Sequence, residues 1–167
     1  MDWIFGILLF LHVFGAIVAF GPTYAFPLIA GMAANERPHM NFALRAQRRI
    51  SHTLVTPLAL LQLVTGLLLV WKLGFDYLTH VWLLTSIVLY FIALAISFVI
   101  LYPALRVLIP ATSAPPPAPP EGAPAPGGPP PEVAAAARRA RIGGMVNSVL
   151  VGVIVLLMVL GANGIVP

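Results

Sequence analysis

Four long apolar runs constrain this chain more than any other feature of its sequence. They cover approximately residues 3–32, 50–71, 77–105 and 145–166. A helix needs roughly 20 apolar residues to cross the hydrocarbon core of a bilayer, and each run is long enough. Because only helices and closed barrels satisfy their backbone hydrogen bonds inside lipid, the runs predict an all-α bundle of four transmembrane helices.

Prolines interrupt the first two of these runs. The first run contains Gly21-Pro22 and Pro27, and a proline inside a helix removes one backbone hydrogen bond and bends the axis. We therefore expect a kinked first helix, or a transmembrane segment followed by a segment that leaves the bilayer at an angle. Thr56-Pro57 in the second run predicts a bend there as well.

Composition supports a lipid-facing surface and excludes several classes of site. Apolar residues make up 60% of the chain and charged residues only 8%, against about 25% charged residues in soluble domains. The chain has no cysteine. This excludes disulfides, iron–sulfur clusters held by cysteine, and any metal or haem bound through a cysteine thiolate. The few basic residues are separated by apolar runs, so we expect no nucleic-acid partner.

The distribution of basic residues predicts the orientation. Four of the nine lie between the first and second runs, and four between the third and fourth. The positive-inside rule places those two loops in the cytoplasm. Both termini and the turn at residues 72–76 then face outward, with Trp3, Trp71 and Tyr77 at the outer boundary. No basic residue precedes the first run, so we expect a retained helix rather than a signal peptide.

The chain divides into three parts by composition. Residues 1–109 hold the first three transmembrane helices. Residues 110–131 contain eleven prolines and predict a cytoplasmic linker rich in polyproline II conformation. Residues 132–167 hold the fourth transmembrane helix, preceded by a short cytoplasmic extension in which Glu132 favours the helix N-terminus.

His12 is the ionisable residue predicted to lie deepest in the bilayer. It lies about 13 Å inside the outer boundary that Trp3 marks. Gly15, Ala16 and Ala19 share its helix face, and small residues admit another helix or a flat ligand. One interpretation is an axial ligand of haem iron, which needs a neutral imidazole in an apolar pocket. The alternative is a histidine hydrogen-bonded to a neighbouring helix.

His80 and His52 are the other histidines near the apolar runs. His80 lies four residues after Asp76, a spacing that permits a hydrogen bond or ion pair between them. His52 is expected at the inner headgroups. His12 and His80 are separated by only about 5–8 Å in depth, so a haem held by two histidines fits this pair better than His12 with His52. Trp82, Ser86 and Tyr90 are available to line such a pocket.

Other polar and small residues in the runs predict helix packing. Gln62, Thr65 and Asn147 are expected to hydrogen-bond across the bundle. Gly144, Ser148 and Gly152 form a stripe of small residues on one face of the fourth helix, which predicts close contact with another helix or a second subunit.

Three segments resemble a known bacterial family. Residues 11–29 (LHVFGAIVAFGPTYAFPLI), 48–71 (RRISHTLVTPLALLQLVTGLLLVW) and 153–167 (VIVLLMVLGANGIVP) resemble a family of small four-helix integral membrane proteins. The resemblance extends to HemJ-type protoporphyrinogen oxidases and, more distantly, to CopD-like domains. It covers all four runs, excludes the proline-rich segment, and implies the bacterial inner membrane as the location.

In the HemJ-type relatives, a histidine in the first helix and a lysine in the third are implicated in haem binding. His12 matches that histidine. The third run has no lysine, and His80 is the basic residue in the corresponding stretch. The relatives also carry an arginine near the end of the first helix, whereas the first arginine here is Arg37. The resemblance implies the scaffold and a haem ligand at His12, but does not imply the oxidase reaction.

Two hypotheses for function follow. The first is an integral membrane protein that binds haem b in the outer half of the bundle, for electron transfer or porphyrin-related redox chemistry. The second is a non-enzymatic accessory subunit of a respiratory or photosynthetic complex, or a homo-oligomer, in which the small-residue face meets a partner. Copper handling is weaker, because the five methionines form no cluster in the sequence.

Overall fold

The fold is that of a helical membrane bundle. The computed structural model describes residues 2–76, 79–113 and 128–166, and within them the regular secondary structure is helical, with no strand. Four continuous helical segments are long and apolar enough to cross a membrane: Trp3–Asn35, Met40–Leu73, Val81–Ala111 and Pro131–Ala162. The predicted all-α fold with four spans is confirmed.

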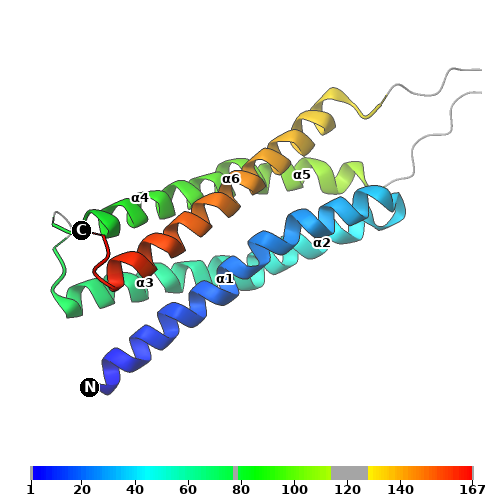
Figure 1. Ribbon diagram of the computed structural model, residues 1–167. Helices are drawn as coiled ribbons and strands as arrows, with labels where there is room; N and C mark the ends of the chain where they lie inside the picture. The colour runs from blue at the N-terminus through cyan, green and yellow to red at the C-terminus, as the bar shows by residue number, and fades with distance from the viewer. Residues whose placement is uncertain (1, 77–78, 114–127, 167) are drawn as a thin grey trace, which may run out of the picture.

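Each span corresponds to one or more of the helices labelled in Figure 1. The first is α1 (Trp3–Asn35), which a short 3₁₀ turn (Arg37–His39) joins to the second span. The second combines α2 (Met40–Ile50), η2 (Ser51–Val55) and α3 (Thr56–Leu73). The third combines α4 (Val81–Ala95), η3 (Ile96–Leu101) and α5 (Tyr102–Ala111), and the fourth is α6 (Pro131–Ala162).

The long first run forms one helix. Pro22 and Pro27 both lie inside α1, which is continuous over 33 residues. The residues after these prolines therefore continue α1, and the predicted kink, or departure from the bilayer at an angle, stays a prediction. At 1.5 Å per residue α1 is about 50 Å long, against about 30 Å of hydrocarbon. Part of α1 must therefore extend beyond the hydrocarbon core or tilt within it.

Two π-helical turns, η2 and η3, interrupt the second and third spans. The N–H of Thr56 bonds to Ser51 O, and the N–H of Tyr102 bonds to Ser97 O, both five residues back. A proline follows each of these residues, Pro57 and Pro103. Because proline has no N–H to donate, the wider turn before it adjusts the hydrogen-bond pattern. The π-turn η2 lies where the sequence predicts a bend, and π-turns occur frequently at functional sites.

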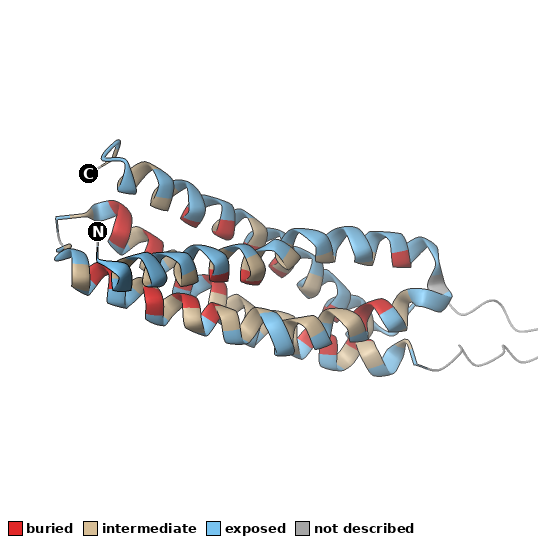
Figure 2. Ribbon diagram, turned by 90° about the horizontal axis from the view of Figure 1, so that it is seen from below, coloured by how far each residue is buried: buried red, intermediate tan, exposed pale blue. Residues whose placement is uncertain are grey.

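The helices pack as two pairs. α1 packs along α3, and α4 packs along α6, while α1 also meets α6 and α2 meets α5 (Figure 1). Within the described residues α3 and α4 do not pack backbone against backbone, so side chains span the space between them. Figure 2 shows exposed residues over most of the outer surface and buried residues on the inward faces, as expected for a bundle whose outside faces lipid.

Small residues form the contact between α1 and α6. Tyr24 Oη donates to Ser148 O over 3.1 Å, and Ser148 Oγ donates to Thr23 O over 3.3 Å. A Cβ added at Gly152 would lie 3.3 Å from Tyr24 Oη. The close-packing face predicted on the fourth helix therefore contacts α1 of the same chain.

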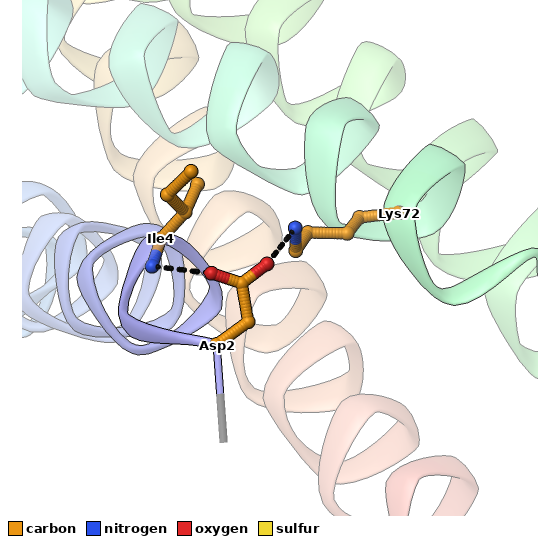
Figure 3. Close-up of polar contacts among 3 residues, drawn as sticks. All are labelled: Asp2, Ile4 and Lys72. Carbon is orange, nitrogen blue, oxygen red and sulfur yellow. Dashed lines mark hydrogen bonds and ion pairs between the residues drawn. The ribbon is translucent and has the colours of Figure 1, made fainter.

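Both termini lie at one end of the bundle, hereafter the terminal end (Figure 1). There Lys72 on α3 donates to Asp2, which also caps α1 by accepting from the Ile4 N–H (Figure 3). The hydrogen bond from Lys72 lowers the pKa of the Asp2 carboxyl. Trp3 and Trp71 are largely exposed near this end, as an aromatic belt requires, and Tyr77 lies outside the described residues.

The opposite end, hereafter the basic end, carries eight arginines, seven of which lie on α2, α5 and α6. A cluster of buried side chains closes the bundle there, made of Leu44, Ala104, Leu105, Leu108 and Ala136. The predicted linker at residues 110–131 falls mostly on residues 114–127, outside the described residues. Having both termini at one end agrees with the predicted topology, and the assignment of the basic end to the cytoplasm stays a prediction.

Candidate functional site

His12 lies in the interface between α1 and α3. Its Nδ1 is 3.2 Å from Thr65 Oγ1, and its Nε2 is 3.1 Å from Gln62 Nε2. Gln62 and Thr65 are both buried. The prediction that these two residues hydrogen-bond across the bundle agrees with this arrangement.

The surrounding hydrogen bonds determine which nitrogen of His12 carries the proton. Thr65 Oγ1 donates its single proton to Leu61 O over 2.8 Å, so it accepts from His12 Nδ1–H. The other ring nitrogen, Nε2, then accepts from the Gln62 amide. His12 is neutral in this arrangement, and Gln62 Oε1 is left buried without a hydrogen-bond partner among the described residues.

Two glycines let the helices approach around this histidine. A Cβ at Gly66 would lie 2.9 Å from His12 Cε1, so the imidazole rests against the backbone of α3. A Cβ at Gly15 would lie 3.1 Å from Gln62 Oε1. Gly15 and Ala19 are both buried, so the face of small residues next to His12 admits α3.

Coordination of haem by His12 would need this interface to rearrange. The proton on Nδ1, held by Thr65, leaves Nε2 as the ligating atom, and metal-bound histidines usually hold their second nitrogen in this way. However, Nε2 already accepts from Gln62, and the ring is packed on Gly66. The residues present orient a ligand but leave no open coordination position in this conformation.

The other two histidines have different neighbours. His80 lies in the connection between α3 and α4, where Nδ1 donates to the Asp76 carbonyl over 2.9 Å and the ring packs against Phe75 and Trp82. His52 in η2 stacks on Tyr102, with ring centroids 4.9 Å apart. Neither shares a contact with His12, and the described residues contain no cluster of His, Asp or Glu able to hold a metal ion.

A cavity of about 650 Å³ lies inside the bundle between the two helix pairs. Its walls are mainly apolar, and every span contributes to them. Phe20, Ala59, Tyr90 and Val151 line the part nearest the terminal end, and Leu105 and Leu108 line the part nearest the basic end. The volume is in the range of about 300–1,000 Å³ typical of small-molecule sites.

Several polar groups line this cavity. Thr56 Oγ1 and Tyr102 Oη are 2.5 Å apart and join α3 to α5. One hydrogen bond uses one of their two hydroxyl protons, so the other can be donated to a ligand. Tyr90 Oη donates to Ala59 O over 2.5 Å and joins α4 to α3. These contacts, rather than backbone packing, connect α3 to α4 and to α5.

Asn147 on α6 is the least satisfied polar residue of the cavity wall. It is 9% exposed, and its Oδ1 is buried without a hydrogen-bond partner among the described residues. The prediction that Asn147 hydrogen-bonds across the bundle is therefore wrong. The reason is that the cavity separates it from the polar groups of α3 and α4.

Comparison with protein families places the chain in one of them. A profile described as a predicted integral membrane protein family (DUF2269) matches residues 6–161. The chain belongs to this family. No curated protein and no solved structure matches the chain. The match supports the integral membrane assignment for all four spans, whereas the wider resemblance to HemJ-type and CopD-like proteins stays a prediction.

The cavity was not predicted from the sequence. Of the residues considered for a pocket, Tyr90 lines the cavity, whereas Trp82 packs on α6 and Ser86 is fully buried and bonded to Trp82 O. The sequence does hold one signal. Thr56-Pro57 and Tyr102-Pro103 each place a hydroxyl residue before a proline, in the halves of two spans nearest the basic end.

Proposed function

We propose that this integral membrane protein binds a lipid-soluble small molecule in the cavity between its helix pairs. The observation that carries the proposal is the cavity of about 650 Å³ with apolar walls and a buried, unpaired Asn147 oxygen. Apolar walls with a few convergent polar groups are the usual composition of ligand sites. An unpaired polar atom costs about 1–3 kcal/mol, which a ligand or an ordered water would offset.

Filling the cavity tests this proposal. Ala93 is buried on α4 and lines the cavity, so the ring of Ala93→Phe would occupy part of the space. We expect this variant to bind oleyl alcohol, a neutral apolar probe, about tenfold more weakly or worse, because overpacking costs roughly 1–3 kcal/mol. Mass spectrometry of the intact protein, titrated in detergent, measures the retained probe.

The matched control is Ala95→Phe, two residues along the same helix, where the side chain is exposed and does not line the cavity. It should bind the probe as the wild type does. Monodisperse elution of both variants shows that they fold. Equal binding by Ala93→Phe and the wild type, or no binding by the wild type, would refute the proposed site.

Haem b at His12 is a second candidate. The observation that favours it is the hydrogen bond that fixes the tautomer of His12 and directs Nε2 away from Thr65. Haem would bring electron-transfer chemistry to the membrane. The protein purified in detergent after expression with added haem should then show a Soret band that His12→Ala abolishes. His80→Ala and His52→Ala test each proposed second ligand, and a spectrum without the band excludes this candidate.

The role of accessory subunit also stays a prediction. It is supported by the small number of polar residues on the outer surface, where large apolar side chains such as Ile17 and Val149 are exposed. Such a surface suits lipid and a neighbouring subunit equally well. Co-purification of stoichiometric partners in a mild detergent would support the role.

A further inference from the structure

The walls of the cavity indicate how a ligand would enter. The buried cluster around Leu44 and Leu105 closes the basic end, and Phe20, Tyr90 and Val151 line the other end. Eight residues that line the cavity are exposed: three on α1 (Pro27, Gly31 and Ala34), three on α6 (Ala137, Arg141 and Met145), and one each on α3 (Leu60) and η3 (Phe98). Because six of these eight residues lie on α1 and α6, the cavity opens mainly between these two helices, next to their contact at Tyr24 and Ser148.

The opening lies near the depth of the lipid headgroups. α6 ends at Ala162, and a hydrocarbon core of about 30 Å takes up roughly 20 residues of a helix. Counted back from Ala162, this length reaches Ile142, next to Arg141. The cavity continues along α6 to Val151, which is about 15 Å deeper into the bilayer than Arg141.

Arg141 gives the opening a positive charge. It is the one charged residue among the described residues that line the cavity. Within the described part of the chain, no carboxylate forms an ion pair with it, since the ion pairs found there are His39 with Glu36 and Lys72 with Asp2. A guanidinium beside an apolar cavity favours a ligand whose anionic group can accept two parallel hydrogen bonds.

We propose that the ligand is an amphiphile with a single apolar chain and an anionic head, which enters from the bilayer between α1 and α6. This inference rests on the proposed function and specifies its ligand class. The head pairs with Arg141 at headgroup depth, and the chain extends along the apolar walls toward Val151, so that an ordered water rather than the chain would satisfy the Asn147 oxygen. One cavity of this volume holds one molecule of drug size, which favours a single-chain over a two-chain lipid.

Matched probes test the charge preference. Oleate and oleyl alcohol have the same chain and differ in the charge of the head. Mass spectrometry of the intact wild-type protein in detergent should show oleate bound about tenfold or more tightly than oleyl alcohol, since hydrogen bonds to charged groups are the strong ones. Arg141→Gln should remove this preference, so that it binds the two probes with similar affinity. Oleoyl lysophosphatidic acid, as a third probe, shows whether a carboxylate or a phosphate is favoured.

Arg139→Gln is the control, because Arg139 is also exposed on α6 but does not line this cavity. It should keep the oleate preference. Equal affinity of the wild type for oleate and the alcohol, or an unchanged preference in Arg141→Gln, overturns the inference while the cavity remains a binding site. If the wild type binds neither oleate nor oleyl alcohol, the proposed function itself is refuted.

Discussion

Gly161→Leu is expected to lower the thermal stability of the bundle more than any other single glycine substitution. Gly161 on α6 lies against the indole ring of Trp82 on α4, so closely that even a Cβ there would overlap the ring. Trp82 is buried, in a cluster with Val70 and Leu83. A leucine would therefore expel the indole and separate α4 from α6 at the terminal end.

The free energy of unfolding is expected to fall by about 3 kcal/mol, at the upper end of the range for overpacked cores. This corresponds to a fall in Tm of about 6–12 °C. Circular dichroism during heating in detergent measures this fall. Gly6→Leu is the control, because a Cβ at Gly6 meets nothing within 4 Å, and its Tm should stay near that of the wild type.

A double variant isolates the contact. Trp82→Ala alone should lower the free energy of unfolding by about 3–5 kcal/mol, because removing the indole leaves a cavity. In Gly161→Leu/Trp82→Ala the leucine fills part of that space, so the combined loss should be smaller than the sum of the single losses. Additive losses would show that Gly161 and Trp82 do not pack together.

Gly66→Leu is expected to have the second largest effect on the thermal stability of the bundle. Its side chain would occupy the position of the His12 ring, whose Cε1 lies 2.9 Å from a Cβ at Gly66. Displacing the ring would break its contacts with Gln62 and Thr65. Because buried groups left unpaired cost about 1–3 kcal/mol, we expect a loss of about 2–3 kcal/mol and a lower Tm by the same measurement.

Two further variants separate packing from helix propensity. His12→Ala makes room for the leucine, so Gly66→Leu/His12→Ala should be more stable than Gly66→Leu. Gly21→Leu, where a Cβ meets nothing within 4 Å, should leave the Tm near the wild-type value. If the double variant were no more stable than Gly66→Leu, the His12 ring would not rest on Gly66.

For the polar residues of the spans, the sequence predicts the need for a hydrogen-bond partner but does not identify the partner. Gln62 and Thr65 were predicted to bond across the bundle, and both approach His12. Asn147 was predicted to do the same, and its Oδ1 has no partner. The residue type shows that each group needs a partner, but the partner depends on which helix faces it and at what distance.

The same distinction applies to the histidines. The depth of each one follows from helix rise, because rise is a local property. Whether His12 and His80 face each other depends on the order of helices around the bundle. In the structure α1 packs on α3 and α4 packs on α6, and the two histidines have separate neighbours. A small-residue face such as that of Gly15 admits a helix or a ligand, and only the packing shows that α3 occupies it.

The sequence by itself determined the four spans, the all-helical class and the grouping of basic residues at one end. These follow from run length and composition, because lipid requires each segment to satisfy its own backbone hydrogen bonds. The tertiary structure alone decided the partners of His12, the π-turns at Thr56 and Tyr102, and the cavity with Arg141 at its opening. Those depend on how helices distant in sequence approach one another, and the local signal at Thr56-Pro57 and Tyr102-Pro103 does not show that a space lies between the helices.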